Sequence, residues 1–340
     1  MSVTIYISGD AAALALGADE VAAAITKHAA KHKQDIRIVR NGSRGLFWLE
    51  PLVEVVTAQG RVAYGPVSAA DVPKLFASNF TAGGKHPLHQ GDIEAHPYLV
   101  KQQRVSLRRV GIVDPRSLDD YLAHGGGKGL ALARNMWSAA IVQQVTDSGL
   151  RGRGGAAFPT GIKWKTVLDT LATQKYIVCN ADEGDSGTFS DRMLMEGDPF
   201  CLIEGMAIAG LAVGANKGYI YVRSEYPHAI AALNAALENV GDWLGDFSIE
   251  VRQAAGAYVC GEETAMLESI EGKRGIVRSK PPLPAISGLF GQPTVITTSS
   301  LSPACRISSR RARRTIVTWV WDVRAARCRS SWRAISNSAA

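Results

Sequence analysis

The fold of this chain is decided by the stretch Leu150-Arg-Gly-Arg-Gly-Gly-Ala-Ala-Phe-Pro-Thr-Gly-Ile-Lys-Trp164. Glycine has no β-carbon, so a glycine-rich loop lets a large planar or phosphorylated ligand approach the backbone closely. Arg153 and Lys163 add positive charge beside this loop, and Phe158 adds a flat apolar face. The same residues would also suit a surface loop built from ordinary turn residues. The glycines that we expect to face a ligand are Gly152, Gly154 and Gly155.

Residues 152–157 formally match the G-x-G-x-x-G/A pattern of dinucleotide-binding loops. That pattern normally follows a strand directly, whereas residues 138–148 predict a helix immediately before this loop. We therefore do not expect an ordinary Rossmann phosphate loop. We expect a loop that binds its ligand with amide donors and positive charge.

A second polar cluster follows the predicted buried strand of residues 176–179 and reads Asn-Ala-Asp-Glu-Gly-Asp from Asn180 onward. In α/β proteins, polar groups at the carboxyl ends of strands commonly bind ligands. Asn180 can donate and accept hydrogen bonds, and the carboxylates can only accept, which suits ribityl or ribose hydroxyls. A capped turn before the predicted helix of residues 199–213 is the alternative. The carboxylates are Asp182, Glu183 and Asp185.

The alternation of strands and helices continues beyond this cluster and predicts a parallel or mixed sheet covered by helices. Further strands are expected at residues 218–223 and 247–251, with a helix at residues 227–237 between them. A strand-like run from Gly256 then turns at Gly261 into a helix. Glu262 and Glu263 lie in the first turn of that helix, where acidic side chains usually interact favourably with the helix dipole. The basic, extended residues 274–284 are expected to cover a ligand.

The first 80 residues predict a separate domain. Strands are expected at residues 3–7, 35–39, 52–57 and 61–64, and helices at residues 11–32 and 68–78. This β-α-β-β-β-α order is typical of a thioredoxin-like domain. Residues 81–100 are rich in glycine, proline and histidine, and they predict a linker. The expected fold class is therefore α/β, with a thioredoxin-like domain followed by a Rossmann-like domain over residues 101–296.

The composition of the chain excludes several classes of function. The net charge is +7, but residues 297–340 hold nine arginines and one aspartate without lysine or glutamate. This tail therefore carries +8 and residues 1–296 carry −1, so the main body gives no reason to expect a nucleic-acid partner. The five cysteines show no C-x-x-C spacing, and we expect no metal site. No apolar run is long enough to span a membrane, and no signal peptide is recognised, so we expect a cytoplasmic protein.

Several motifs together resemble the flavoprotein subunit of respiratory complex I and its relatives, the NAD-linked molybdenum formate dehydrogenases and NAD-reducing hydrogenases. The resemblance covers roughly residues 100–296. It rests on the glycine-rich loop, on Asn-Ala-Asp-Glu, on Gly-Ala-Tyr-Val-Cys-Gly-Glu-Glu-Thr-Ala from Gly256, and on Lys-Pro-Pro-Leu-Pro from Lys280. The fused N-terminal module points most closely to the β subunit of a formate dehydrogenase. In related modules, cysteines that hold a 2Fe–2S cluster lie near Ser43 and Phe47, and here they are missing.

The resemblance implies an FMN cofactor, NAD(H) as substrate, and redox partner subunits that carry iron–sulfur or molybdenum centres. Such subunits could hold the protein at the inner face of a membrane. The flavin carries the chemistry, so no catalytic side chain is expected. The implied FMN-binding residues are Gly152, Arg153, Gly154, Gly155, Lys163, Asn180, Asp182, Glu183, Gly261, Glu262 and Glu263. The implied NADH-binding residues are Phe158, Asp185, Glu263 and Lys280.

The sequence departs from this family after Ile296. The family continues with two asparagines, whereas this chain continues Thr297-Thr-Ser-Ser. Suitable codons can be chosen for Thr297 and the nine residues after it. If one adenine is added before these codons, the shifted frame encodes Asn-Asn-Val-Ile-Ser-Leu-Ala-Ser-Val-Pro. We therefore expect residues 297–340 to be a frameshifted, disordered tail that truncates the protein, with the family's C-terminal 4Fe–4S cluster absent. Two alternatives remain: a docking fragment without cofactor, and a basic arm that binds nucleic acid.

Overall fold

The computed structural model describes residues 2–153, 157–185 and 187–298. The chain divides into two compact units. The first contains residues 1–124, 192–199 and 231–239, and the second contains residues 125–191, 200–230 and 240–340. None of the helices in the described ranges combines the length and the apolar character that a membrane crossing requires.

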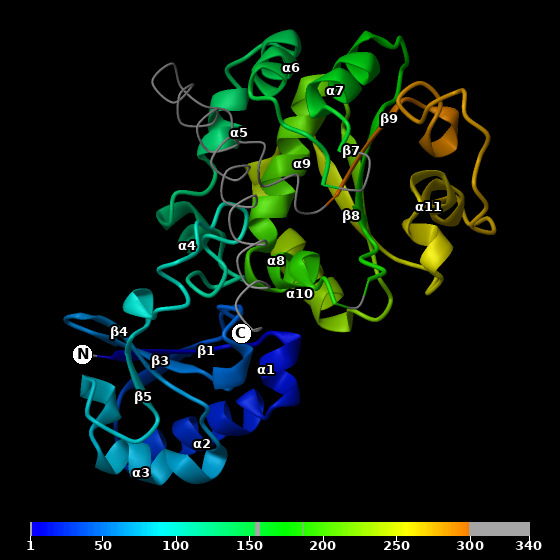
Figure 1. The fold of residues 1–340 in the computed structure, drawn as a ribbon. Helices are drawn as coiled ribbons and strands as arrows, with labels where there is room; N and C mark the ends of the chain where they lie inside the picture. The colour runs from blue at the N-terminus through cyan, green and yellow to red at the C-terminus, as the bar shows by residue number, and fades with distance from the viewer. Residues whose placement is uncertain (1, 154–156, 186, 299–340) are drawn as a thin grey trace, which may run out of the picture. The chain divides into compact units, whose positions relative to one another are not determined.

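The first unit contains a five-stranded mixed sheet, drawn in blue and cyan in Figure 1, with the order β2-β1-β3-β4-β5. β1 pairs in parallel with β2, and every other pair of neighbours is antiparallel. Alternate residues of β1, such as Ile5 and Ile7, are buried and pack against Val21 and Ile25 of α2. The strands are β1 (Val3–Ile7), β2 (Ile36–Val39), β3 (Val53–Thr57), β4 (Gly60–Tyr64) and β5 (His89–Asp92). The helices are α1 (Ala11–Ala15), α2 (Ala18–Lys31), α3 (Val72–Ala77) and α4 (Leu118–Ala123).

Two features of this unit differ from the sequence prediction. The helix expected over residues 11–32 is broken between α1 and α2, because Gly17 has a φ of 94°, which no α-helix contains. Residues 81–100, which the sequence predicted as a linker, instead contribute β5 to the edge of the sheet. The hairpin of β3 and β4 and the capping box of Ser68 and Asp71 agree with the prediction.

Around Ser43, the first unit buries charged side chains that pair with one another or with polar groups. Arg44 is buried and donates to both carboxylate oxygens of Glu54, at 2.7 and 2.8 Å. Ser43 Oγ donates to Glu50 at 2.7 Å, and the backbone N–H of Leu52 donates to its second oxygen. Burial raises the pKa of Glu50 to about 7 against these hydrogen bonds.

The second unit contains a four-stranded sheet with the order β8-β7-β6-β9, in which all neighbours are parallel. Strand β9 extends through Thr298, so the first two residues of the predicted tail belong to the sheet. Their β-branched side chains suit a strand, which explains why the change in composition does not end it. The strands are β6 (Tyr176–Ala181), β7 (Lys217–Val222), β8 (Ser248–Gln253) and β9 (Thr294–Thr298). The rest of the tail, residues 299–340, lies outside the described residues.

Helices cover both faces of this parallel sheet (Figure 1). Helix α9 (Pro199–Val213) lies along one face, where Met206 packs close to Gly218 of β7. Helix α11 (Glu263–Ile270) lies on the other face, where Met266 and Leu267 share a buried core with Tyr219. The strand-like run before α11 is a short 3-10 helix, Tyr258–Gly261. The other helices of this unit are α5 (Lys128–Ala133), α6 (Ser138–Asp147) and α7 (Thr160–Asp169). Two more helices, α8 (Ser190–Gly197) and α10 (Pro227–Glu238), have residues in both units.

Candidate functional site

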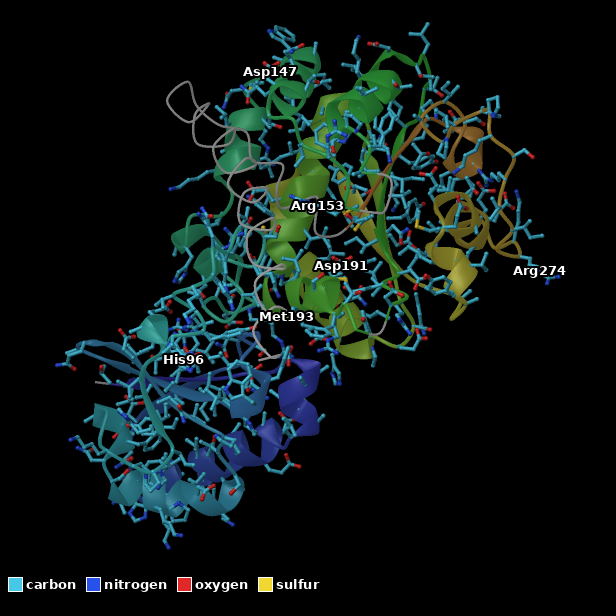
Figure 2. All side chains as sticks on the ribbon, viewed as in Figure 1. His96, Asp147, Arg153, Asp191, Met193 and Arg274 are labelled. Carbon is cyan, nitrogen blue, oxygen red and sulfur yellow. The ribbon has the colours of Figure 1, made fainter. Side chains whose placement is uncertain are left out.

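A pocket of about 200 Å³ lies in the second unit, where β6 and β9 end side by side. This is the edge of a parallel sheet at which α/β proteins commonly bind ligands. Its walls come from the glycine-rich loop, the start of α7, the ends of the two strands and the start of α11. Figure 2 shows Arg153 from this wall among the side chains of the unit. The lining residues are Gly152, Arg153, Ala157, Phe158, Thr160, Lys163, Trp164, Asn180, Gly261, Glu263, Ile296, Thr297 and Thr298.

The glycine-rich loop is closed at its base by backbone hydrogen bonds. Gly152 N–H donates to the Phe158 carbonyl at 2.9 Å, and Thr160 N–H donates to the Leu150 carbonyl at 2.9 Å. The loop leads directly into α7, which begins at Thr160 after Pro159. Gly161 then brings α7 against α6, because a β-carbon there would lie 2.6 Å from the Cα of Thr146. The loop base and α7 therefore form one supported wall of the pocket.

Lys163 is held at the junction between α7 and β9. Its Nζ donates to the backbone carbonyl of Ile296 at 3.0 Å. Burial lowers the pKa of its ammonium group, and the nearby carboxylate of Glu263 opposes that change. A half-buried cation in a pocket favours an anionic group beside it.

Asn180 connects the end of β6 to the turn before α11. Its Nδ2 donates to the carbonyl of Gly261 at 2.8 Å, and its Oδ1 accepts from the N–H of Asp182 at 3.2 Å. A β-carbon at Gly261 would approach the carbonyl of Asp182 only to 3.4 Å. The packing of the described residues therefore does not strictly demand glycine here, whereas a side chain at this position could take up space in the pocket.

The two glutamates at the start of α11 are already partnered. Glu262 is the N-cap of the helix, and its carboxylate accepts from the N–H groups of Thr264 and Ala265. Lys280 Nζ donates to Glu262 at 3.1 Å and to Glu263 at 2.6 Å. Burial works against the charge of Lys280, but these hydrogen bonds outweigh it and raise its pKa. The basic segment of residues 274–284 is thereby tied to α11, with Arg274 on its outer side in Figure 2.

The three acids after β6 separate into different environments. Glu183 is buried and accepts hydrogen bonds from Tyr226 Oη at 3.1 Å and from the N–H of Asp191 at 3.1 Å. Asp182 is half-buried, and burial raises the pKa of its carboxyl group. Asp185 is exposed. None of these three residues lines the pocket in the described part of the chain.

The structure thus brings together some of the predicted binding residues and leaves others apart. Of the predicted set, Glu262 and Lys280 lie next to the lining residue Glu263, while Gly154 and Gly155 lie outside the described residues. Thr160, Trp164, Thr297 and Thr298 line the pocket but were not among the predicted binding residues, although the β-branched end of β9 could have indicated a strand. The predicted residues that line the pocket are Gly152, Arg153, Phe158, Lys163, Asn180, Gly261 and Glu263.

Three buried polar atoms of the lining have no hydrogen-bond partner among the described residues. They belong to one indole and two hydroxyl groups: Trp164 Nε1, Thr160 Oγ1 and Thr298 Oγ1. A buried donor without an acceptor is costly, so such atoms point to a polar ligand or water. A nearby acceptor, Asp182 Oδ2, is also without a partner in the described part of the chain. In residues 2–153, 157–185 and 187–298, no cluster of His, Cys, Asp or Glu is placed to hold a metal ion.

The segment that forms this pocket matches a known protein family. Residues 145–301 match the family model of the Nuo51 FMN-binding domain. The match begins just before the glycine-rich loop and runs through β9, so it includes every wall of the pocket.

Curated relatives agree with this match. The HndC chain of the NADP-reducing hydrogenase of Solidesulfovibrio fructosivorans is 51% identical over 206 residues, which cover 58% of this chain and 42% of that protein. One chain of the NADH-quinone oxidoreductase of Rhizobium meliloti (strain 1021) is 47% identical over 203 residues, covering 56% of this chain and 48% of that protein. This chain therefore spans less than half the length of these relatives.

A solved structure resembles a larger part of the chain. The crystal structure of an NAD+-reducing NiFe hydrogenase in its H2-reduced state superposes with a TM-score of 0.51 and 28% sequence identity. The superposition covers 93% of this chain and 52% of that chain. Both units of this protein thus have counterparts within one longer chain.

Proposed function

We propose that this chain is an FMN-binding flavoprotein subunit that passes hydride between NAD(H) and the flavin within a larger redox complex. The observation that supports this most is the pocket, because residues chosen from sequence motifs in separate segments line the same cavity. The family model that matches residues 145–301 describes an FMN-binding domain.

The residues around the pocket fit a flavin nucleotide. A β-carbon at Gly152 would meet no described atom closer than 3.7 Å, so the protein's own packing leaves this position open toward a ligand. The unpartnered donors and the Lys163 ammonium suit phosphate or carbonyl oxygens. Ligand pockets usually measure about 300–1,000 Å³, so a flavin nucleotide would extend beyond this cavity of about 200 Å³.

Bound FMN would supply a hydride acceptor that can release electrons singly, so the protein needs no acid or base of its own. The chain's task is to position two ligands. In this proposal the glycine-rich loop, Lys163 and Asn180 hold the flavin, and Phe158 and Glu263 lie where the nicotinamide nucleotide enters. Lys280 neutralises Glu263 through their 2.6 Å ion pair and so reduces its repulsion of the nucleotide's phosphates.

We also propose a thioredoxin-like fold for the first unit, supported by its parallel β1–β2 pair and the antiparallel β3–β4 hairpin. The larger complex that we propose is a formate dehydrogenase, to which this chain would contribute the flavoprotein subunit. A fused N-terminal module does not distinguish this complex from a hydrogenase, because the hydrogenase structure covers 93% of this chain. A test is formate-dependent reduction of NAD+ by the complex that copurifies with this chain, compared with hydrogen-dependent reduction.

The frameshift after Ile296 remains part of the proposal. Resequencing the gene tests it, and an uninterrupted frame with codons that exclude the alternative reading would end it. If the frameshift is real, the restored Asn-Asn would replace Thr297 and Thr298 in the pocket lining.

The experiment for the main proposal is reconstitution with FMN followed by anaerobic titration with NADH. We expect about one FMN per chain and loss of the visible flavin absorbance on reduction. Lys163→Met should weaken FMN binding at least tenfold, since a hydrogen bond to a charged group is worth about 1.5–3 kcal/mol. The matched control is Lys165→Met on the same helix, whose ammonium is exposed and paired with Asp169. Failure of the wild-type chain to bind FMN would favour the docking fragment without cofactor.

A further inference from the structure

The start of helix α7 carries an arrangement that the FMN assignment does not explain by itself. Thr160 and Trp164 are each 3% exposed, and both line the pocket. They lie four residues apart on α7, so their side chains share one face of the helix. Neither Thr160 Oγ1 nor Trp164 Nε1 has a hydrogen-bond partner among the residues that the structure describes.

The indole of Trp164 restricts what this pair can bind. An indole N–H can only donate, so its missing partner must be an acceptor. A threonine hydroxyl can also donate, and the two groups together offer two donors from one side of the pocket. Leaving two buried donors unsatisfied is unfavourable, so an acceptor with more than one oxygen would satisfy both.

The surroundings of the pair favour a negatively charged acceptor. The first N–H groups of any α-helix lack acceptors within the helix and carry a partial positive charge. In α7 the N-cap is Pro159, which provides no side-chain cap, and the first turn contains no acidic residue. The N–H of Thr160 donates to the Leu150 carbonyl outside the helix, so the side chains of this turn, rather than its first N–H, are left for a ligand. Lys163, on the same turn, brings a cation whose pKa burial already lowers. Such a helix start is suited to a phosphate group.

We infer that Thr160 and Trp164 form a two-donor phosphate subsite at the start of α7, which binds the terminal phosphate of FMN. This inference rests on the proposed function and assigns one end of the ligand. It makes the indole of Trp164 a hydrogen-bond donor to the cofactor.

The test compares FMN with riboflavin, which lacks only the phosphate. Dissociation constants for both flavins are measured on the full chain by quenching of flavin fluorescence. Thr160→Val and Trp164→Phe should each weaken FMN binding by about tenfold or more, the effect of losing one hydrogen bond to a charged group. Riboflavin binding should change by less than about twofold, because its hydroxyl end carries no charge for the pair to bind.

Matched variants separate this role from a general effect on folding. Thr160→Ser keeps the hydroxyl and should keep the affinity for FMN. Thr166→Val removes a hydroxyl that is bonded to the Ile162 carbonyl on the same helix, and Trp137→Phe removes an indole that is 87% exposed. Both should leave the binding of the two flavins unchanged.

Each outcome has a distinct meaning. Equal weakening of FMN and riboflavin by Trp164→Phe would overturn the phosphate subsite, as would unchanged FMN binding in both variants. If the wild-type chain binds neither flavin, the proposed function itself fails. If the wild-type chain binds FMN and the two substitutions do not change that affinity, this inference is refuted while the proposed function stands.

Discussion

The buried carboxyl of Glu50 should make the first unit less stable as the pH rises from about 4.5 to about 7. Glu50 is 4% exposed, and burial raises its pKa from 4.5 to about 7, with Asp10 and Glu54 acting in the same direction. Below pH 4.5 both the folded and the unfolded chain hold the proton. Between pH 4.5 and about 7 the unfolded chain releases it while the folded chain keeps it, so the free energy of unfolding falls.

The size of this effect follows from the pKa. One pKa unit corresponds to about 1.36 kcal/mol, so a rise from 4.5 to about 7 corresponds to a loss of about 3 kcal/mol above neutral pH. Glu196, which accepts from the N–H of Ala11 at 2.7 Å, should add a similar loss because burial raises its pKa to about 7 as well. Glu50→Gln should therefore remove about half of the pH dependence of the wild-type chain.

The assay is urea denaturation from pH 4.5 to 8, with hydrogen-exchange labelling of peptides from β1 and β3 to follow the first unit alone. Glu20→Gln, which changes an exposed glutamate of α2, is the control and should keep the wild-type slope. The reasoning would be refuted if stability rose with pH over this range, or if Glu50→Gln left the slope unchanged.

Three further substitutions test other contacts. Gly161→Ala would place a β-carbon 2.2 Å from the hydroxyl of Thr146, so we expect a loss of about 1–3 kcal/mol and weaker FMN retention; an unchanged melting temperature would contradict the close packing of α6 and α7. Arg44→Met should cost about 3–5 kcal/mol in urea titrations, because the buried charge of Glu54 would keep only the longer 3.4 Å contact to Arg61. The double change with Glu54→Gln should recover most of that loss, and no recovery would argue against the ion pair as the cause. Lys280→Met should change global stability by less than about 1 kcal/mol but speed trypsin cleavage of its segment, and equal cleavage rates would show that the ion pairs do not hold it.

Much of the parallel sheet could be predicted because short local sequence patterns indicate its strands. Strands β6 and β7 are short runs of apolar and β-branched residues, and the helix expected at residues 199–213 has the bounds of α9. β5 could not be predicted in this way. Its residues, His-Gln-Gly-Asp from His89, have no strand preference, and pairing with β4 determines their conformation.

The site could be predicted in part for a similar reason. The glycine-rich loop and the turn at Gly261 are visible as motifs, and the structure brings both to one pocket. Chemical type alone could not show how each polar residue is used. Glu183 is predicted to bind a ligand, and its carboxylate also accepts a hydrogen bond from Tyr226, a contact that the sequence does not indicate. The missing partner of Trp164 Nε1 depends on three-dimensional packing and has no signal in the sequence.

The assignment of residues 192–199 and 231–239 to the first unit has a practical consequence for dissecting this protein. A gene fragment ending near residue 100 would lack Glu196, whose carboxylate accepts the Ala11 N–H at the start of α1, and the Gly197 backbone that fits against Gly42. The remaining fragment would in turn present those segments to water. Expression trials of separated halves should therefore give aggregation-prone material, and exchanging the N-terminal module between homologous genes would require replacing three stretches of sequence together.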